Sequence, residues 1–118
     1  MEWFIAKLVY QIQSGEGNHQ PQFDEQLRLI QAADFSAALS KAKEVGFDQQ
    51  TTFLNVKKEL VNWRFIDVVA LDKIQSMSDK SEVYSQIVET ESASDYLNDL
   101  KIRARKVRRQ LIQLEHYI

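Results

Sequence analysis

The sequence predicts an α+β fold, a two-layer sandwich in which an antiparallel sheet of four to five strands carries helices on one face. Several runs alternate in the manner of strands, whereas two segments repeat their apolar residues at helical spacing. Most of the strands follow one another directly along the chain, which favours antiparallel pairing. The predicted order of elements is ββαβββα, with a long helix at the C-terminus.

The rest of the fold is expected to be arranged around the strand Leu60–Leu71. This is the longest strongly β-favouring run in the chain, rich in β-branched and aromatic residues and free of glycine and proline. Trp63 and Val69 have one parity along the strand, and Ile66 and Val68 have the other. Apolar residues on both parities predict a central strand that is covered on both faces.

Two further strands come first in the chain, Trp3–Ile12 and Gln22–Ala33, separated by the loop Ser14–Pro21. Because they are neighbours in sequence, an antiparallel hairpin is expected. The first strand has an unbroken apolar parity from Phe4 to Ile12. In the second, one parity is apolar and the other charged, which is typical of a sheet with one solvated side. The apolar row contains Phe23, Leu27 and Leu29, and the charged row contains Asp24, Gln26 and Arg28.

A short helix is predicted over Phe35–Val45. Asp34 is a suitable N-cap, because its carboxylate can accept hydrogen bonds from free amides of the first turn. Gly46 stands where a left-handed C-cap is expected. The predicted buried face includes Ala38 and Ala42, so this helix can approach a sheet closely.

The remaining predicted elements are two strands and the C-terminal helix. The strands are Thr52–Val56 and Ser81–Thr90, and the helix is Ser92–Ile118, capped by Ser92 or Ser94. Apolar residues on this helix repeat at intervals of three and four, which is a heptad pattern. The helix is expected to extend beyond its sheet, so its stripe needs a partner. The stripe consists of Leu97, Leu100, Ala104, Val107, Leu111, Leu114 and Ile118.

The composition is that of one ordinary globular domain. The chain has 118 residues, of which 44% are hydrophobic and 27% charged. We expect one domain, with the sheet and short helix in residues 1–91 and the long helix in residues 92–118. No run approaches the ~18 apolar residues of a membrane span, and the N-terminus lacks a signal-peptide pattern. The chain has no cysteine, which fits a reducing compartment, and we expect a cytoplasmic protein.

The sequence contains no recognised pattern for catalysis. It has no cysteine, no Gly-x-Ser-x-Gly motif and only two histidines. His19 lies in the predicted loop and His116 near the end of the long helix, and neither has an acidic residue at a recognised metal-ligand spacing. No basic helix start follows Gly15 and Gly17, so they do not form a phosphate loop. We therefore predict a protein that is not an enzyme and that uses no cofactor and no metal.

Three segments, residues 3–10, 23–30 and 61–68, together resemble a family of small bacterial proteins described only as a domain of unknown function. Its members open with Trp-aromatic-x-Ala-Lys-aliphatic and contain a Val-x-Trp-x-Phe strand, as do Trp3–Leu8 and Val61–Phe65 here. The family's Ala-Leu-x-Lys-Ala helix and Glu-Val-Tyr-Ser segment are matched by residues 38–42 and 82–85.

This resemblance covers roughly residues 3–90, so the long helix lies outside it. Members often have a glycine in the turn before the tryptophan strand, where this chain has Lys58 and Glu59. That turn is therefore expected to differ here. The resemblance implies a small α+β domain and no particular activity.

One functional hypothesis uses the tryptophans and the charged residues of the strands. If the first and central strands are neighbours, Lys7 and Asp67 could form a partly buried salt bridge. A small pocket with aromatic walls could then hold an anion through Lys7 or Arg28. The alternative, which we favour, is that the tryptophans belong to the core and the charges to its rim. The candidate pocket residues are Trp3, Lys7, Arg28, Trp63, Asp67 and Tyr84.

A second hypothesis uses the uneven charge of the chain. Residues 1–100 hold nine basic and sixteen acidic residues, net −7, whereas residues 101–118 hold six and one, net +5. Such a basic face can bind the phosphate backbone of nucleic acid. It can equally be a solvated face, or one matched to acidic residues of the same domain or of a second subunit. The basic face consists of Lys101, Arg103, Arg105, Lys106, Arg108 and Arg109.

A third hypothesis is self-association through the heptad stripe, and it is the one we favour. A small chain with apolar residues on both parities of its strands, and a helix longer than its sheet, needs more covering surface than it contains. The sequence therefore predicts a non-catalytic interaction module, acting as a homodimer or with another protein and without a membrane. Nucleic-acid binding and small-ligand binding remain the alternatives.

Overall fold

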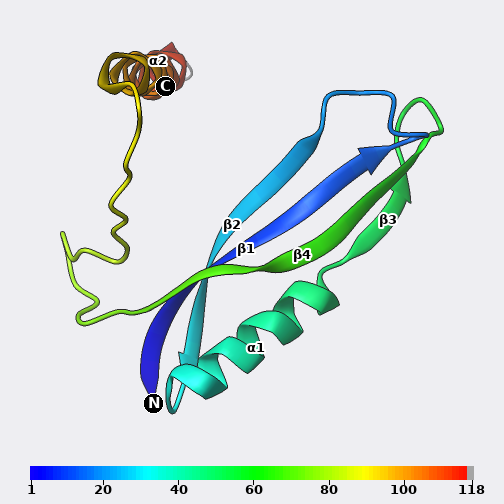
Figure 1. Ribbon diagram of the computed structural model, residues 1–118. Helices are drawn as coiled ribbons and strands as arrows, with labels where there is room; N and C mark the ends of the chain where they lie inside the picture. The colour runs from blue at the N-terminus through cyan, green and yellow to red at the C-terminus, as the bar shows by residue number, and fades with distance from the viewer. Residues whose placement is uncertain (117–118) are drawn as a thin grey trace. The chain divides into compact units, whose positions relative to one another are not determined.

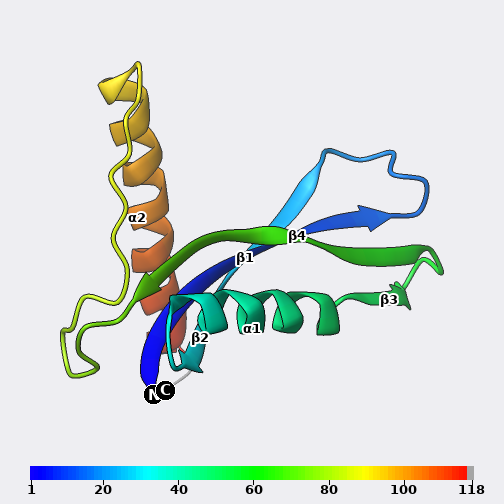
Figure 2. The ribbon, with the colours of Figure 1, turned by 60° about the horizontal axis from the view of Figure 1, so that its bottom comes forward.

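A computed structural model describes the chain over residues 1–116, except for the side chain of His116. It contains two compact units (Figures 1 and 2). The first, Met1–Ser85, holds an antiparallel sheet and one helix, and the second, from Gln86 onward, holds the long helix. The predicted α+β class is confirmed.

The sheet of the first unit has the strand order β2-β1-β4-β3, and every neighbouring pair is antiparallel. Its strands are β1 (Glu2–Ser14), β2 (Gln22–Ala32), β3 (Thr51–Leu54) and β4 (Leu60–Lys73). The central position predicted for residues 60–71 and the hairpin predicted for the first two strands are both confirmed. β2 and β3 form the two edges of the sheet.

Helix α1 (Phe35–Asp48) packs against one face of this sheet (Figure 2). Its buried residues are spaced four apart, which gives the helix a ridge of small side chains. Asp34 caps it as predicted, because its Oδ1 accepts a hydrogen bond from the Ala37 amide at 2.8 Å. The apolar parity predicted for the first strand faces this helix. The core cluster is Phe4, Ala6, Leu8, Tyr10, Ile30, Ala32, Ala38, Ala42 and Phe65.

Gly46 is not the C-cap that the sequence predicted. The helix continues through it to Asp48, and Gln49 takes the cap position. The reason is packing, because a Cβ at Gly46 would lie 2.5 Å from the Phe65 ring. The Tyr10 hydroxyl also donates a hydrogen bond to the Gly46 carbonyl at 3.0 Å. Gly46 therefore serves close contact between helix and sheet rather than a left-handed turn.

Two β-bulges explain why β4 is apolar on both parities. The β1–β4 register shifts between Lys7 and Leu8 and again between Val9 and Tyr10, which leaves Val69 and Ile66 as the extra residues. Val68 therefore packs against the core together with Trp63. Ile66 and Val69 are exposed. The expectation that both faces of this strand are covered is thus wrong for these two residues.

The two sides of β2 are opposite to the expectation. The register with β1 pairs Ile30 with Phe4 and Ala32 with Glu2, which fixes these even-numbered residues on the side of α1. The charged row, from Asp24 to Arg28, consequently lies on the α1 side of the sheet. The apolar row, headed by Phe23, lies on the opposite side and is exposed.

The turn between β3 and β4 contains a residue in the left-handed conformation. Lys58 has φ 61° there, a conformation that costs a residue with a Cβ roughly 1–2 kcal/mol. The Asn55 side chain holds this turn, because its Oδ1 accepts hydrogen bonds from the Lys57 and Glu59 amides at 2.9 and 3.0 Å.

The strand predicted over Ser81–Thr90 is not present, so the observed order is ββαββα. Its few apolar residues are divided between two parities, and therefore neither face of such a strand would be apolar. The predicted long helix is confirmed as α2 (Ala93–His116). Ser92 is at its N-terminus, where its Oγ accepts a hydrogen bond from the Asp95 amide at 3.2 Å.

Candidate interaction surfaces

The structure does not bring the candidate pocket residues into one site. Lys7 and Asp67 lie on the face of the sheet away from α1, which we call the open face, whereas Arg28 and Trp63 lie on the α1 side. Arg28 pairs in register with Ala6, and Trp63 with Ile12. Six residues of strand correspond to ~20 Å, so even these two side chains are far apart.

The expected salt bridge between Lys7 and Asp67 is not formed, although their strands are neighbours. Lys7 Nζ lies 3.1 Å from Glu25 Oε1 of β2. Asp67 Oδ1 accepts a hydrogen bond from the Val68 amide at 2.8 Å. The bulges displace Asp67 along β4, so that it pairs with Val9 rather than with Lys7.

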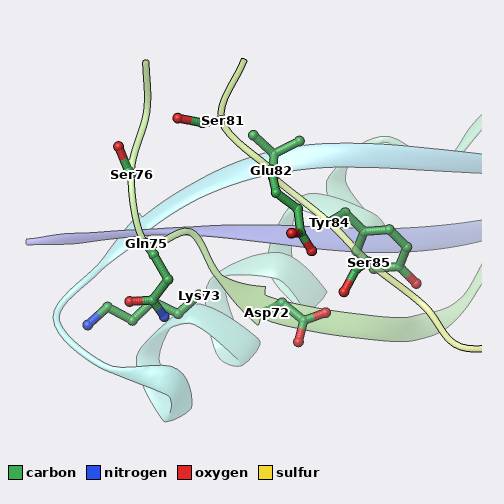
Figure 3. Close-up of a pocket in the computed structure, with 9 residues that line it drawn as sticks. Asp72, Lys73, Gln75, Ser76, Ser81, Glu82, Tyr84 and Ser85 are labelled. Atoms are coloured by element: carbon green, nitrogen blue, oxygen red, sulfur yellow. The ribbon is translucent and has the colours of Figure 1, made fainter. Parts of the chain in front are cut away.

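Trp3 contacts the segment that follows β4, and Tyr84 is part of that segment. The Trp3 carbonyl accepts a hydrogen bond from the Ile74 amide at 2.8 Å. Tyr84 lines a hollow of about 440 Å³ between the end of β4 and residues 81–85 (Figure 3). Ile5 of the open face is only 5% exposed, and its strand partner Asp72 lines the same hollow. Residues 74–85 therefore cover this end of the open face.

The hollow contains few groups suited to chemistry. Its one lysine, Lys73, is paired, with Nζ 2.9 Å from Glu2 Oε1, and the hydroxyls of Ser78 and Ser81 bind each other at 2.8 Å. Among the side chains that the structure describes, which exclude that of His116, no group of three or more histidine, aspartate or glutamate residues could hold a metal ion. The lining residues are Asp72, Lys73, Gln75, Ser76, Ser81, Glu82, Val83, Tyr84 and Ser85.

His19 has a structural role in its loop. Its Nε2 accepts a hydrogen bond from the Ser14 amide at 3.0 Å, and its Nδ1 lies 2.7 Å from the Gln20 carbonyl oxygen. Because Nε2 accepts, Nδ1 carries the proton and donates. Both ring nitrogens are therefore used within the loop. The other histidine, His116, lies at the end of α2.

The buried hydroxyl of Tyr10 is likewise structural. Burial raises the pKa of Tyr10 above its ordinary value, partly offset by the nearby charge of Arg28. The phenol therefore remains a protonated donor to the Gly46 carbonyl. It holds the helix to the sheet and is not available as a catalytic acid or base.

Some of the exposed apolar residues of the first unit lie on β2 and β4, and others lie on α1, on β3 and in the connecting segments. Phe23, Leu27 and Leu29 follow one another along β2 and are each about half exposed. Val69 and Ile66, the two bulge residues of β4, add to the exposed apolar area. The exposed apolar side chains of β2 make this edge of the sheet a candidate interaction surface.

In the second unit, the heptad stripe of α2 is exposed along its described length. Leu97, Val107 and Leu114 are all more than half exposed, and Ala104 is exposed as well. Ile118, the last predicted member of the stripe, lies outside the described residues. The basic face is also exposed, and within it Arg103 NH2 lies 2.7 Å from Asp99 Oδ2 one turn earlier.

The family of the chain follows from its first unit. The family model Domain of unknown function (DUF4288) matches residues 3–85. The chain belongs to the DUF4288 family. The matched residues coincide with the first compact unit, so the sheet and α1 make up the DUF4288 domain and α2 lies outside the match. Searches of curated proteins and of solved structures found no match to this chain.

Sequence reasoning did not find the β2 edge of the DUF4288 domain. Asp24 and Gln26 were interpreted only as members of a solvated charged row, and Arg28 was interpreted as part of that row and as a candidate pocket residue. The signal was nevertheless present, because the two charged residues are opposite in sign and equally spaced about Gln26.

None of the helices described by the structure has the length and apolar character needed to cross a membrane.

Proposed function

We propose that this protein is a non-catalytic interaction module that associates with a second copy of itself in the cytoplasm. The observation that carries this proposal is the exposed heptad stripe of α2. Burying one leucine or valine side chain contributes roughly 1.5–3 kcal/mol. A stripe of this length is therefore a large source of association free energy.

The charges beside the stripe favour an antiparallel pair of helices. In the heptad, Lys101 and Arg108 border one side of the stripe, and Arg103 borders the other. A parallel pair would place Arg103 against Arg108 of the partner subunit, which is repulsive. An antiparallel pair with full overlap of the stripes places Lys101 near Glu115 of the partner subunit twice and Arg108 near Arg108 of the partner subunit once, whereas the parallel pair makes its repulsive contact twice. The antiparallel arrangement also aligns all the described apolar positions with one another.

Sedimentation velocity over a range of about 5–500 µM tests the proposal. The wild-type chain is expected to sediment as a dimer at the upper end of this range. A variant carrying Val107→Glu and Leu111→Glu is expected to have at least a tenfold higher dissociation constant, because it loses two buried side chains. A wild-type chain that remains monomeric throughout would contradict the proposal.

A matched control separates loss of the stripe from the added charge. The substitutions Asn98→Glu and Gln113→Glu introduce the same two negative charges on α2 away from the stripe. This variant is expected to associate like the wild type. If control and stripe variants weaken association equally, charge rather than apolar contact is responsible.

Binding of nucleic acid is the second candidate function, and the exposed basic face of α2 favours it. Six basic side chains within nine residues suit a phosphate backbone. A gel shift with mixed DNA and RNA at about 50 mM salt, weakening steeply at higher salt, would support this alternative. The absence of any shift at this salt concentration would remove it.

A further inference from the structure

The outer edge of β2 has free main-chain hydrogen-bonding groups. The Trp3 carbonyl accepts from Ile74 and thus turns toward β4. In an antiparallel ladder the main chain of alternate residues turns to opposite sides. Trp3 pairs with Gln31 of β2, so the main-chain amide and carbonyl groups of Gln31 turn away from β1, toward the outer edge of the sheet. Because the β1–β2 register is regular along its whole length, the same is true of every second residue of β2. These outward residues are Phe23, Glu25, Leu27, Leu29 and Gln31.

Each end of this edge has a feature that stops further pairing. At one end, Lys41 Nζ donates a hydrogen bond to the Gln31 carbonyl at 2.9 Å, so that acceptor is already used. At the other end, Pro21 has no amide hydrogen to donate. Pro21 and Gln31 are equally spaced about Gln26 along the chain. If two such strands pair antiparallel about Gln26, the missing donor of Pro21 faces the acceptor that Lys41 already satisfies.

We propose that β2 pairs antiparallel with β2 of a second copy of this chain, with the two-fold axis at Gln26. The contact extends the sheet across two molecules and leaves no unpaired main-chain group at either end of the ladder. The proposal rests on the proposed function in taking the partner to be a second copy. It goes beyond it by assigning a contact in the DUF4288 domain itself.

Charge complementarity supports this register on the α1 side of the sheet. The arrangement places Asp24 directly opposite Arg28 of the partner subunit, and the two-fold axis makes that contact twice. In the single chain, Gln26 links the two charged residues. Its Nε2 donates to Asp24 Oδ2 at 2.6 Å, and its Oε1 accepts from Arg28 NH2 at 2.8 Å. The side chains are therefore already aligned in one row along the edge.

Apolar contact supports the same register on the open face. Phe23 lies opposite Leu29 of the partner subunit, and this pair also forms twice. Both side chains are about half exposed in the single chain, and cross-strand pairs of this type stabilise sheets. Glu25 lies opposite Leu27 of the partner subunit and retains its ion pair with Lys7.

Neighbouring registers lack this complementarity. An axis at Glu25 places that carboxylate against its own symmetry copy and separates Asp24 from Arg28. An axis at Leu27 places the Phe23 amide against the Gln31 carbonyl, which Lys41 already uses. The axis at Gln26 is therefore the one that satisfies both the main chain and the charges.

Charge reversal in the full-length chain tests the contact. Asp24→Arg or Arg28→Asp alone places like charges opposite each other twice, and each is expected to raise the dissociation constant of the dimer at least tenfold. The double variant Asp24→Arg/Arg28→Asp restores both pairs and is expected to associate like the wild type. An equimolar mixture of the two single variants is likewise expected to form heterodimers. Unchanged association of both single variants would overturn the proposal.

A cysteine scan reads the register directly, because the chain contains no cysteine. Gln26→Cys places two thiols opposite each other at the axis, within the Cα separation that a disulfide requires. Asp24→Cys and Arg28→Cys each place their two thiols ~13 Å apart along the strands. Oxidation is expected to cross-link the Gln26→Cys variant and neither of the other two. Equal cross-linking of all three, or none, contradicts the register.

The outcomes distinguish this contact from the proposed function as a whole. If the wild-type chain associates but neither the reversals nor the cysteine scan gives the expected pattern, the β2 contact is excluded and self-association stands. A chain that remains monomeric at several hundred micromolar overturns both. Repeating the reversals with Val107→Glu and Leu111→Glu present measures the β2 contact without the stripe.

Discussion

Gly46 shows how one residue can be identified correctly as special and assigned the wrong role. A glycine near the end of a helical pattern predicts a left-handed cap. Here the helix continues past Gly46. Glycine is required at this position because the Phe65 ring occupies the space that a Cβ would need. The alanines at Ala38 and Ala42 did predict close approach of the helix. The identity of the side chain that comes closest depends on the tertiary contact and is absent from the local sequence.

We predict that Gly46→Ala destabilises the protein even though alanine is the better helix former. The added methyl group overpacks the contact with Phe65, and overpacking costs about 1–3 kcal/mol. The gain in helix propensity is at most about 1 kcal/mol. The free energy of unfolding from urea titration, followed by circular dichroism, measures the balance.

Ser40→Ala provides the control, because Ser40 lies in the same helix and is exposed. This variant is expected to be unchanged or slightly more stable. A Gly46→Ala variant that is as stable as the control would show that the helix can move away from the sheet without cost.

Among the elements, β4 shows what periodicity can and cannot predict. Its β-branched and aromatic composition predicted a central strand, and that prediction is confirmed. The bulges were not predicted, because two structures give the same sequence pattern of apolar residues on both parities. One is a strand buried on both faces, and the other is a strand buried on one face whose register shifts at a bulge. Only pairing with β1 shows that Val68 and Val69 have different environments.

We therefore predict different effects for the same substitution at these adjacent positions. Val68→Lys places a charge against the core cluster and is expected to cost about 2 kcal/mol or more. Val69→Lys changes an exposed bulge residue and is expected to cost within about 0.5 kcal/mol. Urea unfolding of both variants checks the difference. Equal destabilisation would contradict the bulged register.

The sidedness of β2 has a related explanation. Alternation in β2 correctly predicted two unlike faces, but the charged row and not the apolar row lies on the side of the helix. Ile30 and Ala32, at the end of the strand, decide that through their contacts with α1 and β1. The candidate pocket was not predictable for the same reason. Residues such as Lys7 and Arg28 are assigned to opposite faces only once the register is known.

At the scale of the whole molecule, two independent observations give the same boundary. The family model ends at residue 85, and the first compact unit also ends at Ser85. Every member of the core cluster lies within this unit. The apolar stripe and the basic face belong to α2, beyond the boundary. The chain thus combines a DUF4288 domain that contains its own core with a helix whose described apolar residues are exposed.

We predict that a chain ending after Ser85 folds cooperatively without α2. Because all the core side chains are retained, its free energy of unfolding at low micromolar concentration is expected to be within about 1 kcal/mol of the full-length value. Thermal and urea unfolding followed by circular dichroism measure this directly. Loss of a cooperative transition would show that α2 contributes to the stability of the sheet unit. A shortened chain that still forms a dimer would further show that contacts within the DUF4288 domain, such as the β2 edge, suffice for association.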